Sequence, residues 1–371
     1  MYDPRLDKLA RLIVEYSLET EPGHEVMINA SPLAEDLVGA CCRAVVKVGA
    51  HPSFNIGLPG LNEIRINESS EEQLKYISPA VRTRFQTTDR FLNIRAGYNS
   101  KALTNVDKQK MQIAQRASAE LLEIYQKREA AGELSWSLCQ FPTHSGAQDA
   151  EMSLAEYWEF VMEACKLNEE DPVAAWREVH DIQEKICAYL GEHKDFRVTA
   201  PGTDLSYCAA GRTWVNCDGR HNMPDGEVFT GPLEDSVNGH ITYSFPAIHL
   251  GHEVQNVRLE FKDGKVVDAA ADKGEEFLHS VLDTDEGARY VGEVAIGTNY
   301  NIKHFSKNML FDEKIGGTCH VALGRSIPDS GGVNKSVIHW DMLCDLKDGG
   351  RYTADGETFY ENGRFVKPIK F

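Results

Sequence analysis

The sequence lacks the motifs by which several large enzyme classes are recognised. It has no Walker loop, no GxSxG elbow and no GxGxxG after a strand, so the common signatures of nucleotide binding and serine hydrolysis are missing. His252 and Glu253 begin an HExxH motif, but Asn256 stands where the second histidine belongs, so the helical zinc motif is broken. Any catalytic residues are therefore expected to be dispersed along the chain.

Cysteine motifs and long apolar runs are also missing. The nine cysteines form no CxxC pair and no regular framework, which argues against a disulfide scaffold or a thiolate zinc site and favours free thiols in a reducing compartment. No stretch approaches the about 18 apolar residues that a membrane span requires. The opening segment, MYDPRLDKLARLIVEYSL, lacks the apolar core of a signal peptide. We expect a soluble, cytoplasmic protein without a membrane partner.

Basic residues are few relative to acidic ones. The chain has 39 lysines and arginines against 57 aspartates and glutamates, and a formal net charge of -18. Nucleic-acid binding depends on clustered positive charge, so no nucleic-acid partner is expected. With 371 residues, 42% of them hydrophobic, the chain can bury a sizeable core and is long enough for two domains.

The sequence changes style near residue 192. Before it, apolar strand-like runs at 25–30, 51–58, 90–97 and 134–142 alternate with helical segments, a pattern typical of an α/β domain with a largely parallel sheet. After it, short strand-like runs are broken by Gly, Pro and Asp turns, which favours a mostly antiparallel α+β arrangement. We predict an N-terminal domain over residues 1–192 and a C-terminal domain over residues 193–371.

Two helix starts are well marked in the first half. Ser153 and Glu156 have the spacing of a capping box before an apolar segment. Asp171 followed by Pro172 is typical of a helix N-terminus, and apolar residues then recur with helical periodicity. These signals predict helices that begin near residues 154 and 172.

Side chains of the kinds that bind metal ions recur in strand-like segments of the C-terminal half. They are Glu227, Glu293, His320, His339 and Asp341. His339 and Asp341 are the sharpest pair, because residues i and i+2 of an extended segment point to the same face while Trp340 points to the other. Two histidines and three carboxylates suit one or two divalent cations such as zinc, cobalt, manganese or iron.

Each of these positions also has an ordinary structural explanation. A lone histidine in an apolar strand, such as His320, is commonly a hydrogen-bonded core residue. Glu227 and Glu293 each follow a glycine and precede an apolar run, where an ionised glutamate is rarely buried without a partner. The recurrence of five such positions in one region favours a metal centre in the C-terminal domain.

Long ordered motifs in the chain resemble a known family. The run from Gly202 to Ile241, the GEVAIG, GGTCHVALG and NKSVIHWDM segments, and the stretch at 134–161 are similar to the aminopeptidase T and aminopeptidase S group of dinuclear metallopeptidases. The similarity covers nearly the whole chain.

The resemblance implies a specific site and activity. It implies two divalent ions per chain (zinc, cobalt or manganese), held by residues matching the five positions above, with Glu293 as the bridging carboxylate. It also implies a homodimeric, metal-dependent aminopeptidase that hydrolyses N-terminal residues from peptide substrates through a metal-bridged water.

The chain departs from the family pattern at one position. Members of the family commonly carry a tyrosine shortly after the CHVALG-type segment, in a position expected to help catalysis, and this chain has Ile327 there. An isoleucine donates no hydrogen bond to an oxyanion or a substrate. The resemblance therefore leaves the catalytic residues unassigned, and Tyr290 and Tyr300 are candidates to replace the tyrosine.

Two alternatives stay open. A related branch of the superfamily resembles ring-cleaving dioxygenases that hold one ferrous ion with two histidines and a carboxylate, which here are His320, His339 and Asp341. The retention of Glu227 and Glu293 favours two ions and hydrolysis. The other alternative is a metal-stabilised binding protein without catalysis.

Overall fold

The computed structural model describes residues 2–367 and residue 369. The chain forms two compact units that are interleaved along the sequence: Met1–Ala174 with Gly219–Pro224, and Ala175–Asp218 with Asp225–Phe371. The domain boundary expected after residue 192 stays a prediction. Within the described residues, no helix has both the length and the apolar character needed to cross a membrane.

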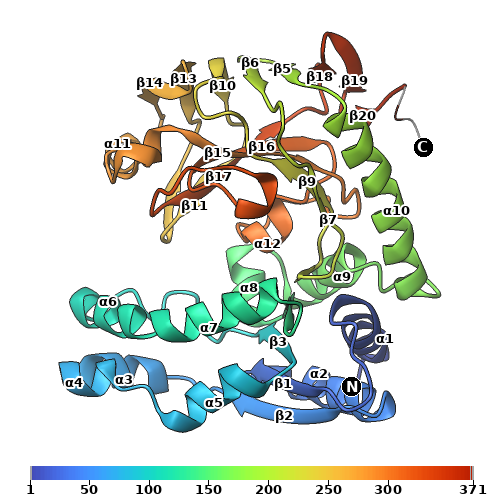
Figure 1. Ribbon diagram of the computed structural model, residues 1–371, viewed down its shortest axis with the longest axis vertical. Helices are drawn as coiled ribbons and strands as arrows, with labels where there is room; N and C mark the ends of the chain where they lie inside the picture. The colour runs from blue at the N-terminus through green and yellow to red at the C-terminus, as the bar shows by residue number, and fades with distance from the viewer. Residues whose placement is uncertain (1, 368, 370–371) are drawn as a thin grey trace. The chain divides into compact units, whose positions relative to one another are not determined.

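The first unit is an α/β structure built on a parallel sheet (Figure 1). Its strand order is β2-β1-β3-β4-β8, and every neighbouring pair is parallel. The strands are β1 (Glu25–Ala30), β2 (His51–Ile56), β3 (Arg90–Arg95), β4 (Ser135–Gln140) and β8 (Asn222–Met223). The predicted N-terminal parallel sheet is therefore confirmed, and its four longer strands lie in the four apolar runs.

Helices precede the first of these strands and connect the others. They are α1 (Arg5–Leu12), a π-helix (Ile13–Ser17), a 3-10 turn (Pro32–Ala34), α2 (Glu35–Lys47), α3 (Leu61–Glu68), α4 (Glu71–Lys75), α5 (Pro79–Thr87), α6 (Lys108–Ala117), α7 (Ala119–Ala130), α8 (His144–Asp149) and α9 (Leu154–Ala164). Helix α2 contacts β1 and β2.

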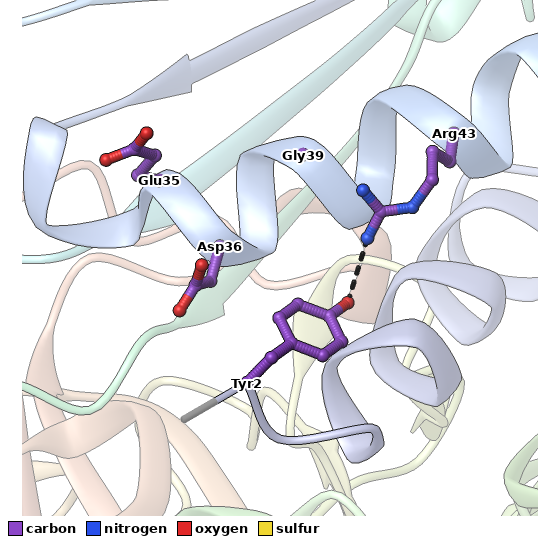
Figure 2. A pocket seen from close by; sticks show the side chains of 5 residues that line it. All are labelled: Tyr2, Glu35, Asp36, Gly39 and Arg43. Carbon is purple, nitrogen blue, oxygen red and sulfur yellow. Dashed lines mark hydrogen bonds between the residues drawn. The ribbon is translucent and has the colours of Figure 1, made fainter.

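A depression of about 430 Å³ lies beside this helix, where the Arg43 guanidinium donates a 2.9 Å hydrogen bond to the Tyr2 hydroxyl (Figure 2). This bond fastens the N-terminal segment to α2.

The second unit consists mainly of antiparallel strands, as the sequence predicts. An eight-stranded sheet has the order β14-β13-β10-β6-β5-β18-β19-β20, and a five-stranded sheet has the order β17-β16-β15-β9-β7. The eight strands are β5 (Asp195–Ala200), β6 (Thr203–Cys208), β10 (Asn238–Thr242), β13 (Arg258–Lys262), β14 (Lys265–Ala270), β18 (Arg351–Ala354), β19 (Glu357–Glu361) and β20 (Arg364–Phe365).

The remaining elements of this unit are the strands of the five-stranded sheet, a separate strand pair, and several helices and turns. They are β7 (Val215–Cys217), β9 (Glu227–Thr230), β15 (Val291–Gly297), β16 (Thr318–Gly324) and β17 (His339–Asp345), a separate pair β11 (Ala247–His249) and β12 (His252–Val254), and the helices α10 (Pro172–Gly191), α11 (Glu275–Leu282) and α12 (Met309–Asp312), with 3-10 turns at Glu286–Arg289 and Pro328–Ser330. His252 and Glu253 lie on a strand, so the incomplete HExxH is not part of a helix. Helix α10 begins in the first unit and continues in the second.

A single apolar core joins the two large sheets of the second unit. Phe196 and Leu205 come from the eight-stranded sheet, while Ile296, Val321 and Trp340 come from the five-stranded sheet. Since successive side chains on a strand point to opposite faces, the residues between these core positions are directed to the other face of the five-stranded sheet.

Both predicted helix starts are confirmed. Helix α9 begins with a capping box in which the amide of Glu156 donates to the Ser153 hydroxyl at 3.2 Å and the Ser153 amide donates to the Glu156 carboxylate at 2.8 Å. Helix α10 begins at Pro172, and the Asp171 carboxylate accepts from the amide of Val173 at 3.1 Å.

The capping box gives a test of local stability. We expect Ser153→Ala to lower the free energy of unfolding by about 1 kcal/mol, because one amide at the start of α9 loses its acceptor. Urea denaturation monitored by circular dichroism measures this change. Glu156→Gln is the matched control, since glutamine also fits the box. Equal stability of wild-type protein and Ser153→Ala would show that the cap contributes nothing.

Candidate metal centre

The five-stranded sheet has one apolar face and one polar face. Val294, Val321 and Trp340 enter the apolar core. The strand register places Glu293 opposite Ala322, and Ala322 opposite Asp341, on the three neighbouring strands β15, β16 and β17 (Figure 1). The alternation that builds the core therefore also places two carboxylates in one row on the other face.

His320 and Glu227 lie on the same polar face. His320 on β16 is opposite Ala295 on β15, two residues along each strand from the pair Ala322 and Glu293. Glu227 on β9 is opposite Gly297 on β15. Gly226, directly before Glu227, has a φ of +121°, and a β-carbon there would lie 2.8 Å from that of Asn299. Only glycine suits that conformation and close approach, so Gly226 sets the direction in which the chain begins β9.

All five predicted ligand residues come together on this face. The His320 Nε2 atom lies 3.1 Å from Glu293 Oε1 and 3.5 Å from Glu227 Oε2. The His339 Nε2 atom lies 3.3 Å from Asp341 Oδ1 and 3.6 Å from Glu293 Oε2. His339 and Asp341 thus converge as the i, i+2 spacing predicts.

The five residues form two groups, each with candidate ligand atoms within 4.8 Å of one another. One group is Glu227, Glu293 and His320, and the other is Glu293, His339 and Asp341. Glu293 belongs to both. Its two carboxylate oxygens face different histidines, with Oε1 toward His320 and Oε2 toward His339.

The donor atoms at this face fit a divalent cation. Glu227 Oε2, Glu293 Oε2 and Asp341 Oδ1 are buried and have no hydrogen-bond partner among the described residues, an arrangement that is unfavourable unless a cation is bound there. The Nδ1 atom of His339 lies 2.7 Å from the carbonyl oxygen of Arg325. Such a bond fixes the ring and leaves Nε2 as the ligand atom, as is usual for histidines that bind metals.

The pKa shifts of the glutamates and histidines on this face also show that the site favours bound positive charge. Burial raises the pKa of both Glu227 and Glu293. Burial opposes the charged form of His320, but the hydrogen bond to Glu293 and the nearby carboxylates outweigh it and raise the pKa to about 9. For His339, Asp341 and Glu293 likewise outweigh burial, and the pKa rises to about 10. The carboxylates therefore draw protons onto both imidazoles where no cation is bound.

The sequence patterns did not indicate four residues around this centre. Lys314 is fully buried, and its ammonium lies 3.1 Å from Glu227 Oε1 and 3.8 Å from Asp225 Oδ1, and it also contacts Glu313. Cys217 forms a third group of possible ligands with Asp225 and Glu227. For Glu313 and Lys314 the sequence offered only the charged FDEK segment shortly before the strand of His320, and for Cys217 and Asp225 it offered no comparable signal.

The position of Tyr300 bears on the missing family tyrosine. Its hydroxyl donates to the carbonyl oxygen of Gly363 at 3.0 Å, and the Arg364 guanidinium lies 4.0 Å from its ring centroid. Its hydroxyl is therefore engaged with the C-terminal hairpin.

Ile327 is half-buried and directly precedes the Pro328–Ser330 turn. It lies two residues after Arg325, whose carbonyl holds His339.

The sequence matches the family model described as Thermophilic metalloprotease (M29) over residues 2–365. The chain belongs to this metalloprotease family. The resemblance inferred from its motifs is confirmed, and membership makes the chain a peptide hydrolase that depends on divalent metal. The fold expected for it, a mixed α/β structure, is confirmed as well.

Known relatives of this M29 chain match it along almost its full length. It is 31% identical to aminopeptidase 2 of Geobacillus stearothermophilus, with 98% of each chain covered. Its structure is similar to that of wild-type AmpT from Thermus thermophilus, with a TM-score of 0.83, 27% identity, and 99% of this chain and 100% of the other covered. The 2,5-dihydroxypyridine dioxygenase of Pseudomonas putida has a TM-score of 0.60 at 12% identity, with 98% and 97% covered, which shows a shared fold.

The buried carboxylates predict that divalent ions stabilise this metalloprotease. An ion that binds only the folded protein adds about 2.7 kcal/mol to the free energy of unfolding when its free concentration is 100 times the dissociation constant. We expect zinc, cobalt or manganese to raise the melting temperature of chelator-treated protein in differential scanning calorimetry. The doubly substituted Glu227→Gln, Asp341→Asn protein is the control, and an equal increase in both proteins would place the binding elsewhere.

Proposed function

We propose that the chain is an aminopeptidase that removes N-terminal residues from peptides with two divalent ions held by the five residues of the polar face. Family membership and the aminopeptidases among its relatives support the reaction. The observation that carries the two-ion proposal is the position of Glu293 in both ligand groups. One carboxylate oxygen directed at each histidine is the arrangement that a bridging ligand needs.

Charge balance supports two ions rather than one. Five carboxylates gather at or beside the site: Asp225, Glu227, Glu293, Glu313 and Asp341. The Lys314 ammonium offsets one of the five negative charges, and the four that remain equal the charge of two divalent ions. With a single ion, two protons would have to be held at the site instead, on imidazoles or carboxylates that then no longer serve as metal ligands.

The residues have separate parts in the proposed reaction. Divalent ions bound here would lower the pKa of a water and polarise the scissile carbonyl. Glu293 would hold the two ion positions at a fixed separation. The Arg325 carbonyl orients His339, and the small side chains of Ala295 and Ala322, which stand opposite His320 and Asp341 in the register, leave room above the sheet.

The dioxygenase alternative uses only part of this arrangement. His320, His339 and Asp341 could hold one ferrous ion, but that set leaves Glu227 and Glu293 with unpartnered buried oxygens. The likeness to the dioxygenase concerns the fold, since the identity is 12%. The buried glutamates therefore favour hydrolysis. The homodimer and the cytoplasmic location belong to the same proposal and stay predictions.

Replacing the shared carboxylate tests the proposal. We expect Glu293→Gln to fold, to bind less metal, and to lose more than about 100-fold in turnover, because a neutral amide cannot bridge two cations. Elemental analysis gives the metal content per chain, and leucyl and arginyl chromogenic amides give the activity.

The matched control is Glu260→Gln, which changes an exposed glutamate on β13 in the same unit. It should keep full metal content and activity. Unchanged metal and activity in Glu293→Gln would remove this residue from the site. One iron per wild-type chain and no amide hydrolysis would instead support the dioxygenase.

The departure at residue 327 gives a gain-of-function test. We expect Ile327→Tyr to raise kcat on the chromogenic amides about tenfold, since a hydroxyl can donate a hydrogen bond to the developing oxyanion. Ile327→Phe adds a ring without the hydroxyl and is the control, with no expected gain. Equal kcat values for the two variants would show that a hydroxyl at this position does not assist the reaction.

A further inference from the structure

Lys314 is a buried cation placed at the edge of the metal centre. Its side chain is 0% exposed, and it contacts three carboxylates from two segments of the chain: Asp225 and Glu227 from one, and Glu313 from its own. A buried ammonium is unfavourable unless it is paired and hydrogen-bonded, so the position of Lys314 is tied to these carboxylates.

The backbone around Lys314 holds it in this place. Its amide donates to the carbonyl of Phe311 at 3.1 Å, and its carbonyl accepts from the amide of Asn299 at 3.0 Å. The side-chain amide of Asn299 in turn donates to the carbonyl of Asp225 at 2.9 Å. Asn299 therefore links Lys314 to the turn before β9 that carries Asp225.

The two oxygens of Glu227 have different surroundings. Oε1 accepts from the Lys314 ammonium at 3.1 Å, whereas Oε2 lies 3.5 Å from His320 Nε2 and has no hydrogen-bond partner among the described residues. The lysine thus fixes the carboxylate in the rotation that directs Oε2 to the polar face.

The ammonium also stands beside the third group of possible ligands. Cys217, Asp225 and Glu227 have ligand atoms within 4.8 Å of one another, and Lys314 lies within ion-pair distance of both carboxylates. The Lys314 ammonium therefore already offsets negative charge in this group, while the Oε2 atom of Glu227 stays directed to the group with His320.

We propose that Lys314 is a positioning residue, a built-in cation that orients Glu227 toward one of the two ion positions and keeps external cations out of the Cys217 group. This rests on the proposed two-ion function. Of the two groups proposed to hold ions, the group with His320 contains Glu227, and the group with His339 and Asp341 does not. Loss of Lys314 should therefore weaken one ion and spare the other.

The test is zinc binding to chelator-treated protein, measured by competition with a chromophoric chelator and by calorimetry. Wild-type protein should bind two ions. In Lys314→Met one ion should bind about 10- to 100-fold more weakly, the range typical for the loss of a residue that orients a metal ligand, and the other should change by less than about threefold. Activity is recorded separately, so the binding result does not depend on turnover.

Three further variants make the result specific. Lys262→Met removes an exposed lysine on β13 and should bind both ions like wild type. In a Glu227→Gln background, Lys314→Met should have no additional effect on zinc affinity, because the lysine acts through that carboxylate. The charge-matched Asp225→Asn, Lys314→Met protein removes the ammonium together with one carboxylate, and it carries the same test if the single variant does not fold.

The outcomes separate this inference from the function on which it rests. Two ions in wild type and equally tight binding in Lys314→Met would overturn the positioning role and leave the proposed function standing. Equal weakening of both ions would also overturn it, because that is the signature of a general loss of structure or charge. Fewer than two ions in wild type would contradict the two-ion function itself, and the Lys314 inference with it.

Discussion

Buried negative charge is the constraint on which this structure depends. Carboxylates on three strands of one sheet, β9, β15 and β17, gather on its polar face where little water can solvate them, and such an arrangement is stable only with positive charge close by. The chain supplies one permanent cation in Lys314 and two imidazoles that take up protons readily. The negative charge that remains favours the binding of a cation, which agrees with membership of a metalloprotease family.

The same backbone alternation serves both the core and the site. Trp340 lies between His339 and Asp341 in sequence and on the opposite face of the sheet. A register shift of one residue would direct the tryptophan to the polar face and the carboxylate into the core. The large apolar core therefore holds the ligand positions in place, and mutations that loosen that core are expected to affect metal binding even when they touch no ligand.

The sequence predicted those features that depend on local pattern. Period-two alternation placed His339 and Asp341 together, the capping box marked the start of α9, and the apolar runs marked the four longer parallel strands. Grouping Glu227 and Glu293 with the histidines needed the pairing of strands far apart in the chain, which the family motifs indicated and periodicity did not. Lys314 escaped prediction, because a lysine beside two acidic residues is usually solvated and only tertiary structure brings Asp225 to it.

The position of β17 at the edge of the five-stranded sheet would affect how metal enters and leaves the proposed site. Edge strands open locally at lower free energy than strands paired on both sides, and β17 carries His339 and Asp341 while β15 and β16 are paired on both sides. If two ions bind as proposed, the ion next to β17 would therefore exchange faster. Under limiting metal the protein would pass through a state with one ion, retained beside the inner strands, and the edge position would respond first to changes in metal supply.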